Sequence, residues 1–183
     1  MQLSDSRSIA AAPDAVWAAI FDPEVLKACV PGCESMTGSV EAGYEAVVVQ
    51  KVGPVSARFT GLVTLSDIVP GRSVTISGEG KGGAAGFAKG GAKVRLEPAE
   101  GGTLLSYDVE ASVGGKIAQL GSRIIDGFAK KMADQFFERF AETVEGPKEP
   151  EPAVAGEEQP KKGWLGKLFG KKTEAAASEG GEA

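Results

Sequence analysis

The sequence predicts an α+β fold, in which a curved antiparallel sheet of about seven strands wraps around one long C-terminal helix. Residues 34–113 alternate apolar and polar side chains at a period of two, with turn signals between the runs. From about Gly115 to Thr143 the apolar residues instead recur with the period of a helix. Such a helix would be roughly 43 Å long, enough to cross a whole domain.

The elements before the sheet are short. Residues 3–9 alternate in polarity and form the first predicted strand. Pro13 and Asp14 suit the first turn of a helix, and Pro23 begins a second short helix that ends at a Pro-Gly turn. The fold class therefore includes two short helices after the first strand.

Glycine and proline divide the central stretch into hairpins, and consecutive hairpins form a strongly curved antiparallel sheet. The predicted strands lie near residues 35–41, 44–52, 55–67, 72–80, 88–97 and 103–113. The predicted helix carries one apolar stripe, with Gly121 on it. The stripe consists of Ile117, Leu120, Ile124, Ile125, Phe128 and Met132.

Composition divides the chain into four parts. Residues 1–145 form the predicted ligand-binding domain, and residues 146–160, with four prolines and five charges, form a flexible linker. Residues 161–172 are an apolar and basic segment, and residues 173–183 form a disordered tail.

Charge and residue usage narrow the function classes. The net charge is −5 and no region is broadly basic, so we expect no nucleic-acid partner. The chain has no histidine, which removes the commonest general base and most zinc sites. Cys29 and Cys33 offer half a zinc site at best, and we interpret both as packing residues of a turn. We expect no metal, no catalytic residues and no covalent cofactor.

The chain begins without a basic and apolar leader, and no run reaches the roughly 18 apolar residues that a membrane span needs. We therefore expect a cytoplasmic protein.

The predicted inner face of the sheet is apolar but has few large side chains. Its small residues are Ala57, Gly61, Gly78, Gly80, Ala88, Gly90, Ala92 and Ala111. Either the helix packs tightly on this face, or an apolar cavity remains for a lipid-like ligand. Among the predicted inner side chains, Tyr107 is the one with a polar end, and its hydroxyl is a candidate hydrogen-bond donor to that ligand. The predicted cavity residues are Val48, Phe59, Gly61, Val63, Ile76, Gly78, Phe87, Ala92, Val94, Tyr107, Leu120, Gly121, Ile124 and Phe128.

Two further features have alternative interpretations. Asp5 and Arg7 are either solvated on an edge strand or, if their face is the inner one, a buried pair at the cavity rim. The glycine-rich residues 78–91 match a dinucleotide-binding pattern, but strands flank them where that pattern requires a helix, so we do not expect nucleotide binding. They are interpreted as a flexible hairpin with Phe87 at its tip. Phe87 is either a lid over the cavity, a contact for a partner, or part of a mobile loop.

Three stretches resemble the CoxG family of carbon monoxide dehydrogenase subunits, within the START-like (SRPBCC) superfamily of helix-grip folds. They are "VPGCESM", "GEGKGGAAGFAKGGAKVRLEP" and "VGGKIAQLGSRIIDGFAKKMADQFFERF", and the resemblance covers roughly residues 1–145. It implies an apolar cavity under the long helix and a bound respiratory quinone, either menaquinone or ubiquinone. It also implies a role in linking a molybdenum carbon monoxide dehydrogenase complex to the membrane and the respiratory chain.

Residues 161–172 are interpreted as a weak membrane anchor. If helical, the segment places Trp164, Leu165, Leu168 and Phe169 on one side. Five lysines favour an anionic surface, namely Lys161, Lys162, Lys167, Lys171 and Lys172. The alternatives are docking onto the chain's own domain or into a groove of a partner.

The main hypothesis is thus a monomeric, non-enzymatic quinone carrier, peripheral on the inner face of the cell membrane. The alternatives are a recruitment or assembly factor for the dehydrogenase without a ligand, and a START-like enzyme of the cyclase or hydrolase type.

Overall fold

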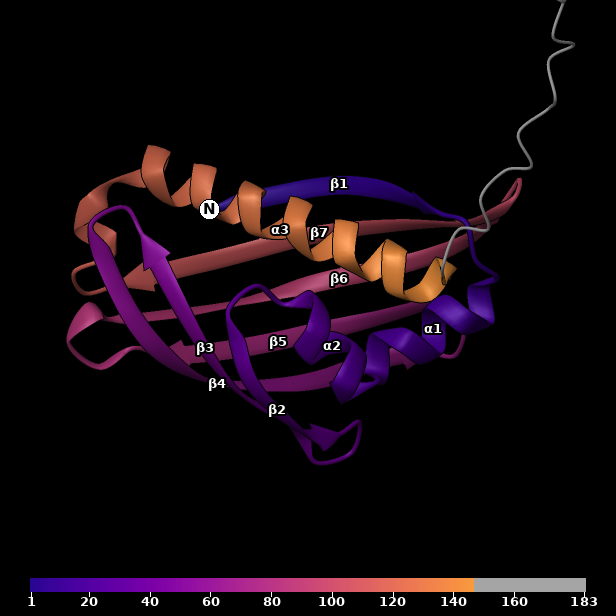
Figure 1. The fold of residues 1–183 in the computed structure, drawn as a ribbon, viewed down its shortest axis with the longest axis horizontal. Coiled ribbons are helices and arrows are strands. Elements are labelled where there is room, and N and C mark those ends of the chain that lie inside the picture. Colours follow the sequence, from indigo (N-terminus) through magenta and orange to yellow (C-terminus); the bar gives the residue numbers. More distant parts are fainter. Residues whose placement is uncertain (147–183) are drawn as a thin grey trace, which may run out of the picture. The chain divides into compact units, whose positions relative to one another are not determined.

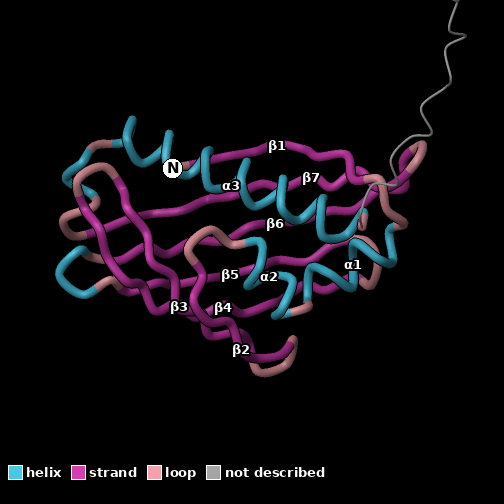
Figure 2. The backbone as a smooth tube through the Cα atoms, viewed as in Figure 1, coloured by secondary structure: helices cyan, strands magenta, loops and turns pink. Residues whose placement is uncertain are grey.

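The computed structural model describes residues 1–146 of the chain. Figures 1 and 2 show a curved sheet with one long helix lying across its concave side. The elements are, in chain order, β1 Gln2–Ile9, α1 Pro13–Phe21, α2 Pro23–Cys29, β2 Cys33–Ser39, β3 Gly43–Val52, β4 Val55–Val69, β5 Ser73–Lys81, the 3₁₀ turn Gly83–Ala85, β6 Phe87–Ala99, β7 Gly102–Gly114, the 3₁₀ turn Ala118–Leu120 and α3 Ser122–Glu145. The predicted fold class is confirmed.

All seven strands belong to one antiparallel sheet, in the order β1-β7-β6-β5-β4-β3-β2. The first strand pairs with the last, so β1 is an edge of the sheet, as the sequence suggested. The register aligns the predicted inner residues across the sheet, because Gly78 lies opposite Val63 on one side and opposite Gly90 on the other. Alternation along each strand therefore identifies the concave face correctly.

The last helix begins later than the sequence predicted. Gly115 and Gly121 have φ angles of 78° and 89°, which a right-handed helix does not allow. A short 3₁₀ turn lies between them, and α3 begins only at Ser122. Ile117, Leu120 and Gly121 therefore belong to the connection before the helix, and the prediction that they lie on its apolar stripe is wrong.

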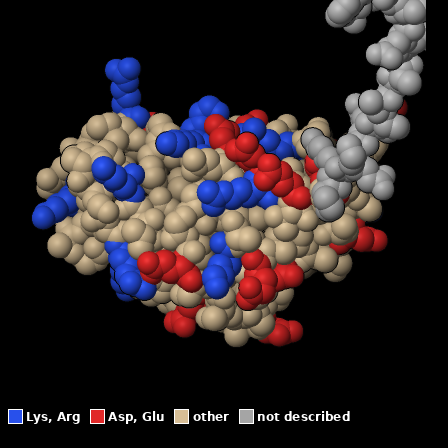
Figure 3. Space-filling model, in the orientation of Figure 1, with Lys and Arg blue, Asp and Glu red and all other residues tan. Residues whose placement is uncertain are grey.

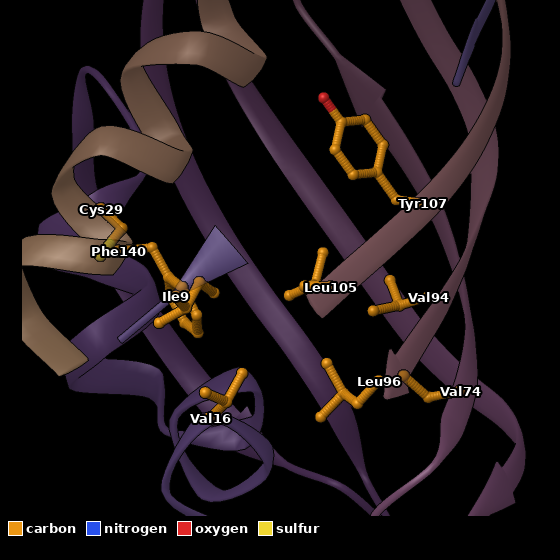
Figure 4. Close-up of a cluster of buried hydrophobic side chains, with 9 residues drawn as sticks. All are labelled: Ile9, Val16, Cys29, Val74, Val94, Leu96, Leu105, Tyr107 and Phe140. Atoms are coloured by element: carbon orange, nitrogen blue, oxygen red, sulfur yellow. The ribbon is translucent and has the colours of Figure 1, made fainter. Parts of the chain in front are cut away.

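The core gathers at the end of the sheet where α1, α2 and the C-terminal half of α3 meet (Figure 4). Phe140 of α3 is 1% exposed and packs there with Val16 of α1. Cys29 is fully buried beside Thr143, and burial raises the pKa of its thiol. It packs as part of the core, whereas Cys33 is half-buried.

Among residues 1–146, no helix combines the length and the apolar character that crossing a bilayer would require.

Candidate functional site

Two adjoining apolar cavities lie on the concave face of the sheet, and helix residues line only the smaller one. The smaller has a volume of about 190 Å³ and lies against the core. The larger has a volume of about 420 Å³, is open to solvent, and shares Val30, Met36, Val63 and Ile76 with the smaller. A volume of this order is typical of sites for small organic ligands.

Missing side chains create the space of the larger cavity. A Cβ atom built on Gly80 would meet no atom within 4 Å, and one on Gly61 or Gly78 would meet only atoms at 3.6 Å or beyond. The backbone at these three positions has room above it, so their missing side chains leave a void, whereas a Cβ on Gly90 would lie 2.3 Å from the Glu110 carbonyl oxygen. The three positions do not mark a tight contact between helix and sheet.

The two halves of α3 differ in packing. Phe136, Phe137 and Phe140 of the C-terminal half line the smaller cavity. In the N-terminal half Ile124 is 44% exposed, although it belongs to the apolar stripe. The helix is thus fixed in the core at one end, while its other end extends beyond the core.

The structure places the predicted cavity residues in three groups. Val48, Phe59, Gly61, Val63, Ile76, Gly78 and Ala92 line the larger cavity. Val63, Ile76 and Val94 line the smaller one, and Tyr107 lies opposite Val94 on the neighbouring strand. Phe87, Leu120, Gly121, Ile124 and Phe128 line neither cavity.

Side chains alternate between the two faces along β6, and Phe87 lies on the outer face, as Lys89 does. Its ring covers Gly114, where an added Cβ would lie 2.3 Å from it. Phe59 instead reaches the β5–β6 hairpin from within the larger cavity, because its ring lies where a Cβ on Gly82 would be. The aromatic side chain between the cavity and this hairpin is therefore Phe59.

Sequence reasoning missed the wall of the smaller cavity that the helices supply. This wall consists of Ile20, Leu26, Val30, Phe136, Phe137 and Phe140, with Met36 and Tyr44 from β2 and β3. The spacing i, i+1, i+4 of the three phenylalanines is a helical-face signal that the predicted stripe, which ended at Met132, did not include. Tyr44 donates its hydroxyl proton to the Phe21 carbonyl at 2.8 Å and so fixes α1 to the sheet.

A polar cluster lies beside this wall, between β1 and α3. Arg7 forms ion pairs with Asp5 at 2.9 Å and with Asp134 at 2.5 Å, and Lys130 lies 3.3 Å from Asp134. The Tyr107 hydroxyl and the Asp134 carboxylate raise the pKa of Arg7, and Arg7 with Lys130 lowers the pKa of Asp134. The register of β1 places Asp5 opposite Tyr107 and Arg7 opposite Leu105, and thus on the inner face. Both side chains are partly exposed on an edge strand and neither lines a cavity, so the structure does not bear out a buried pair at the cavity rim.

Two polar atoms of this cluster, Arg7 Nε and Tyr107 Oη, are buried without a hydrogen-bond partner of proper geometry among the described residues. Tyr107 is 4% exposed and stacks on Phe137 with ring centroids 4.7 Å apart. Leaving a buried hydroxyl unpaired costs about 1–3 kcal/mol, so such a group calls for an explanation. Since Phe137 also lines the smaller cavity, a ligand there would lie close to a free donor.

A larger depression lies on the opposite, outer face of the sheet, and Thr64, Glu79 and Lys89 are among the residues that line it. Its charged lining and open shape do not suit an apolar ligand. The predicted membrane segment, residues 161–172, lies outside the described residues.

The sheet, the long C-terminal helix and the apolar cavities between them define the protein as a helix-grip protein with space for a ligand. The model of a family of carbon monoxide dehydrogenase subunits, CoxG, matches residues 6–145. The chain therefore belongs to the CoxG family, as its resemblance predicted.

Solved structures share the fold of this chain. A conserved protein from Geobacillus kaustophilus is 27% identical with a TM-score of 0.74, over 79% of this chain and 95% of that chain. Proteins from Chromobacterium violaceum (19% identity, TM-score 0.59, 80% and 99% covered) and Thermus thermophilus (15%, 0.60, 81% and 100%) share the fold. No curated protein matches the sequence.

Proposed function

We propose that this protein is a non-enzymatic carrier that holds a respiratory quinone in the cavities beneath α3. The observation that carries the proposal is the pair of adjoining apolar cavities beside one buried, unpartnered hydroxyl. A quinone has the matching chemistry, with a flat apolar ring, carbonyl oxygens that accept hydrogen bonds and an apolar chain. The ring would lie near Tyr107 and Phe137, and the chain would follow the larger cavity.

The partner is proposed from the family, whose description links it to carbon monoxide dehydrogenase. The protein would meet that enzyme in the cytoplasm, receive electrons on the bound quinone, and pass them to the respiratory chain at the membrane. It would act as a monomer that is peripheral on the inner face of the membrane. The molybdenum cofactor belongs to the enzyme, and the proposal assigns no metal to this chain.

Organic extraction tests the proposal most directly. The protein is purified from its native host without detergent, and the extract is examined by mass spectrometry. A near-stoichiometric quinone is the expected result. Protein that carries no quinone and takes none up from quinone-containing vesicles would contradict the carrier role and leave recruitment of the dehydrogenase as the remaining function.

Replacing Tyr107 with phenylalanine separates a ligand-binding role from a structural one. The hydroxyl lies near Arg7 but has no hydrogen-bond partner of proper geometry among residues 1–146, so its removal should leave the free energy of unfolding unchanged or raise it by up to about 1 kcal/mol. Quinone affinity should fall about tenfold, because a hydrogen bond from a buried donor is lost. Urea unfolding and a quinone titration measure the two effects. An unchanged affinity would mean that Tyr107 does not contact the ligand.

The predicted anchor is tested by deleting residues 161–172 from the full chain. Four apolar side chains and five lysines would be lost from any contact with lipid, so binding to anionic vesicles should weaken at least tenfold. Vesicle co-sedimentation measures this, and the thermal unfolding midpoint serves as the control for the domain. Undiminished co-sedimentation would refute the anchor without bearing on the cavity.

A further inference from the structure

Three connections that are distant in sequence meet at one end of the domain, the end opposite the core (Figure 1). A Cβ on Gly53, in the β3–β4 turn, would lie 3.7 Å from Ile124 at the start of α3. The backbone N–H of Ile117, after β7, donates to the carbonyl of Ala85, in the β5–β6 hairpin, at 3.0 Å. We call this end, formed by residues 50–57, 80–89 and 112–125, the tip face.

The tip face has a charge opposite to that of the rest of the domain. Its three segments contain five basic residues and no acidic ones, whereas the remainder of residues 1–145 contains nine basic and 18 acidic residues. Lys81 is paired at 3.1 Å with Glu79, which adjoins the face. The basic residues are Lys51, Lys81, Lys89, Lys116 and Arg123, and all five are exposed. In Figure 3 blue side chains predominate at this end, and most red ones lie along α3 and toward the other end. The N-terminus of α3 adds the positive end of its dipole.

Exposed apolar side chains lie among these charges. Phe87 is 43% exposed and Ile124 is 44% exposed, although both are large enough to be core residues. Each lies next to a glycine, Phe87 beside Gly114 and Ile124 beside Gly53. Large apolar groups surrounded by basic ones are the composition that binds the interface of an anionic bilayer.

We propose that the tip face docks directly on an anionic lipid bilayer, with Phe87 and Ile124 entering the headgroup region and the basic residues contacting lipid phosphates. An acidic protein surface could also satisfy the lysines and Arg123, and the experiment below distinguishes it from a bilayer. The proposal extends the membrane association proposed above, and it does not depend on residues 161–172.

Docking by this face would bring the cavity to the lipid. Phe59, Gly80 and Ala88 of the larger cavity belong to or adjoin the same hairpins as the tip face. A ligand leaving the bilayer would therefore travel a short distance before the apolar lining of the cavity surrounds it. Only this transfer of a ligand from the bilayer to the cavity depends on the proposed carrier function. Docking of the tip face on a bilayer does not depend on it.

Charge neutralisation in the full chain tests the proposal. The variant Lys81→Gln/Lys116→Gln/Arg123→Gln is compared with Lys27→Gln/Arg72→Gln/Arg139→Gln, which removes the same charge from exposed positions outside the tip face. Binding is measured by co-sedimentation with vesicles of phosphatidylcholine containing about one-third phosphatidylglycerol. Each basic side chain near such a surface strengthens binding about fivefold. We expect the tip variant to bind at least tenfold more weakly, and the control to stay within about twofold of the wild type.

A second variant tests the apolar contact. Ile124→Asn keeps the net charge and alters an exposed side chain, so folding should be retained while vesicle binding weakens several-fold. Equal vesicle binding by the tip variant and its control would overturn the proposal. So would loss of binding to the dehydrogenase with vesicle binding intact, since the face would then be a protein interface. The quinone content of each purified variant is a separate readout, so failure of the carrier function is distinguished from failure of the tip face.

Discussion

A leucine in place of Gly78 is expected to abolish quinone binding while the domain folds normally. Gly78 lies in the middle of the concave face, between Val63 and Gly90 on the neighbouring strands. A Cβ there would meet the Leu62 carbonyl and the Val63 side chain at 3.6 Å, an ordinary contact distance. The rest of the leucine side chain would extend over Gly90 and occupy the larger cavity, which Gly78 lines.

Stability should not fall in this variant. Glycine within a strand costs roughly 0.5–1 kcal/mol in conformational entropy compared with a residue that has a side chain, and the new side chain buries apolar surface. We therefore expect a free energy of unfolding equal to that of the wild type or about 1 kcal/mol higher. Quinone binding should fall below detection, because the volume that the ligand needs is filled.

Ser77→Leu is the matched control, because it adds a leucine at the adjacent position of the same strand. Ser77 is exposed and faces away from the larger cavity. Quinone binding should match the wild type in this variant. If Gly78→Leu still took up quinone with wild-type affinity, the ligand would not occupy the larger cavity, and the carrier proposal would have to place it elsewhere.

The sheet and its inner face could be predicted because alternation along a strand fixes the direction of each side chain. Gly61, Gly78 and Ala92 were assigned to the cavity on that ground alone, and all three line it. Pairing register was not needed, since alternation within each strand already separates its apolar side chains from its polar ones, and the register of the structure then places these apolar sets opposite each other, as with Val63 and Gly78. The excess of small residues on one face was therefore visible from sequence.

The remaining parts of the site depend on contacts between distant segments. The start of α3 was misplaced because Gly115 and Gly121 fit a helical pattern in composition, whereas their backbone angles break it. Arg7 could not be assigned to the inner face from β1 alone. Its ion pair with Asp134 joins residues 127 positions apart. The polar cluster next to Tyr107 thus becomes visible only once the edge strand is placed beside the helix.

The packing of α3 indicates how one helix can serve both stability and ligand uptake. Its C-terminal half contributes the buried residue of the helix, Phe140, whereas Ile124 near its N-terminus is 44% exposed. Local openings cost least where few apolar contacts are broken. Movement that admits a ligand is therefore expected at the N-terminal half of α3, and the C-terminal half should hold the domain together.

Phe140→Ala should accordingly produce the largest loss of stability of any single substitution considered for this domain. Phe140 is 1% exposed, stacks on Phe136 with centroids 5.7 Å apart, and packs in the core with Ile9 and Val16. Truncating a buried phenylalanine costs about 3–5 kcal/mol, from lost burial and from the cavity left behind. The free energy of unfolding of a domain of this size is only about 5–15 kcal/mol. The thermal midpoint should fall by about 10–15 °C.

Leu62→Ala provides the comparison, because Leu62 is 56% exposed on the outer face and its truncation should change stability by less than about 0.5 kcal/mol. Urea unfolding followed by circular dichroism measures both variants. A loss below about 1 kcal/mol for Phe140→Ala would mean that the C-terminal half of α3 does not anchor the helix. The division of α3 into a fixed end and a movable end would then fail, and uptake of a ligand would require motion of the whole helix.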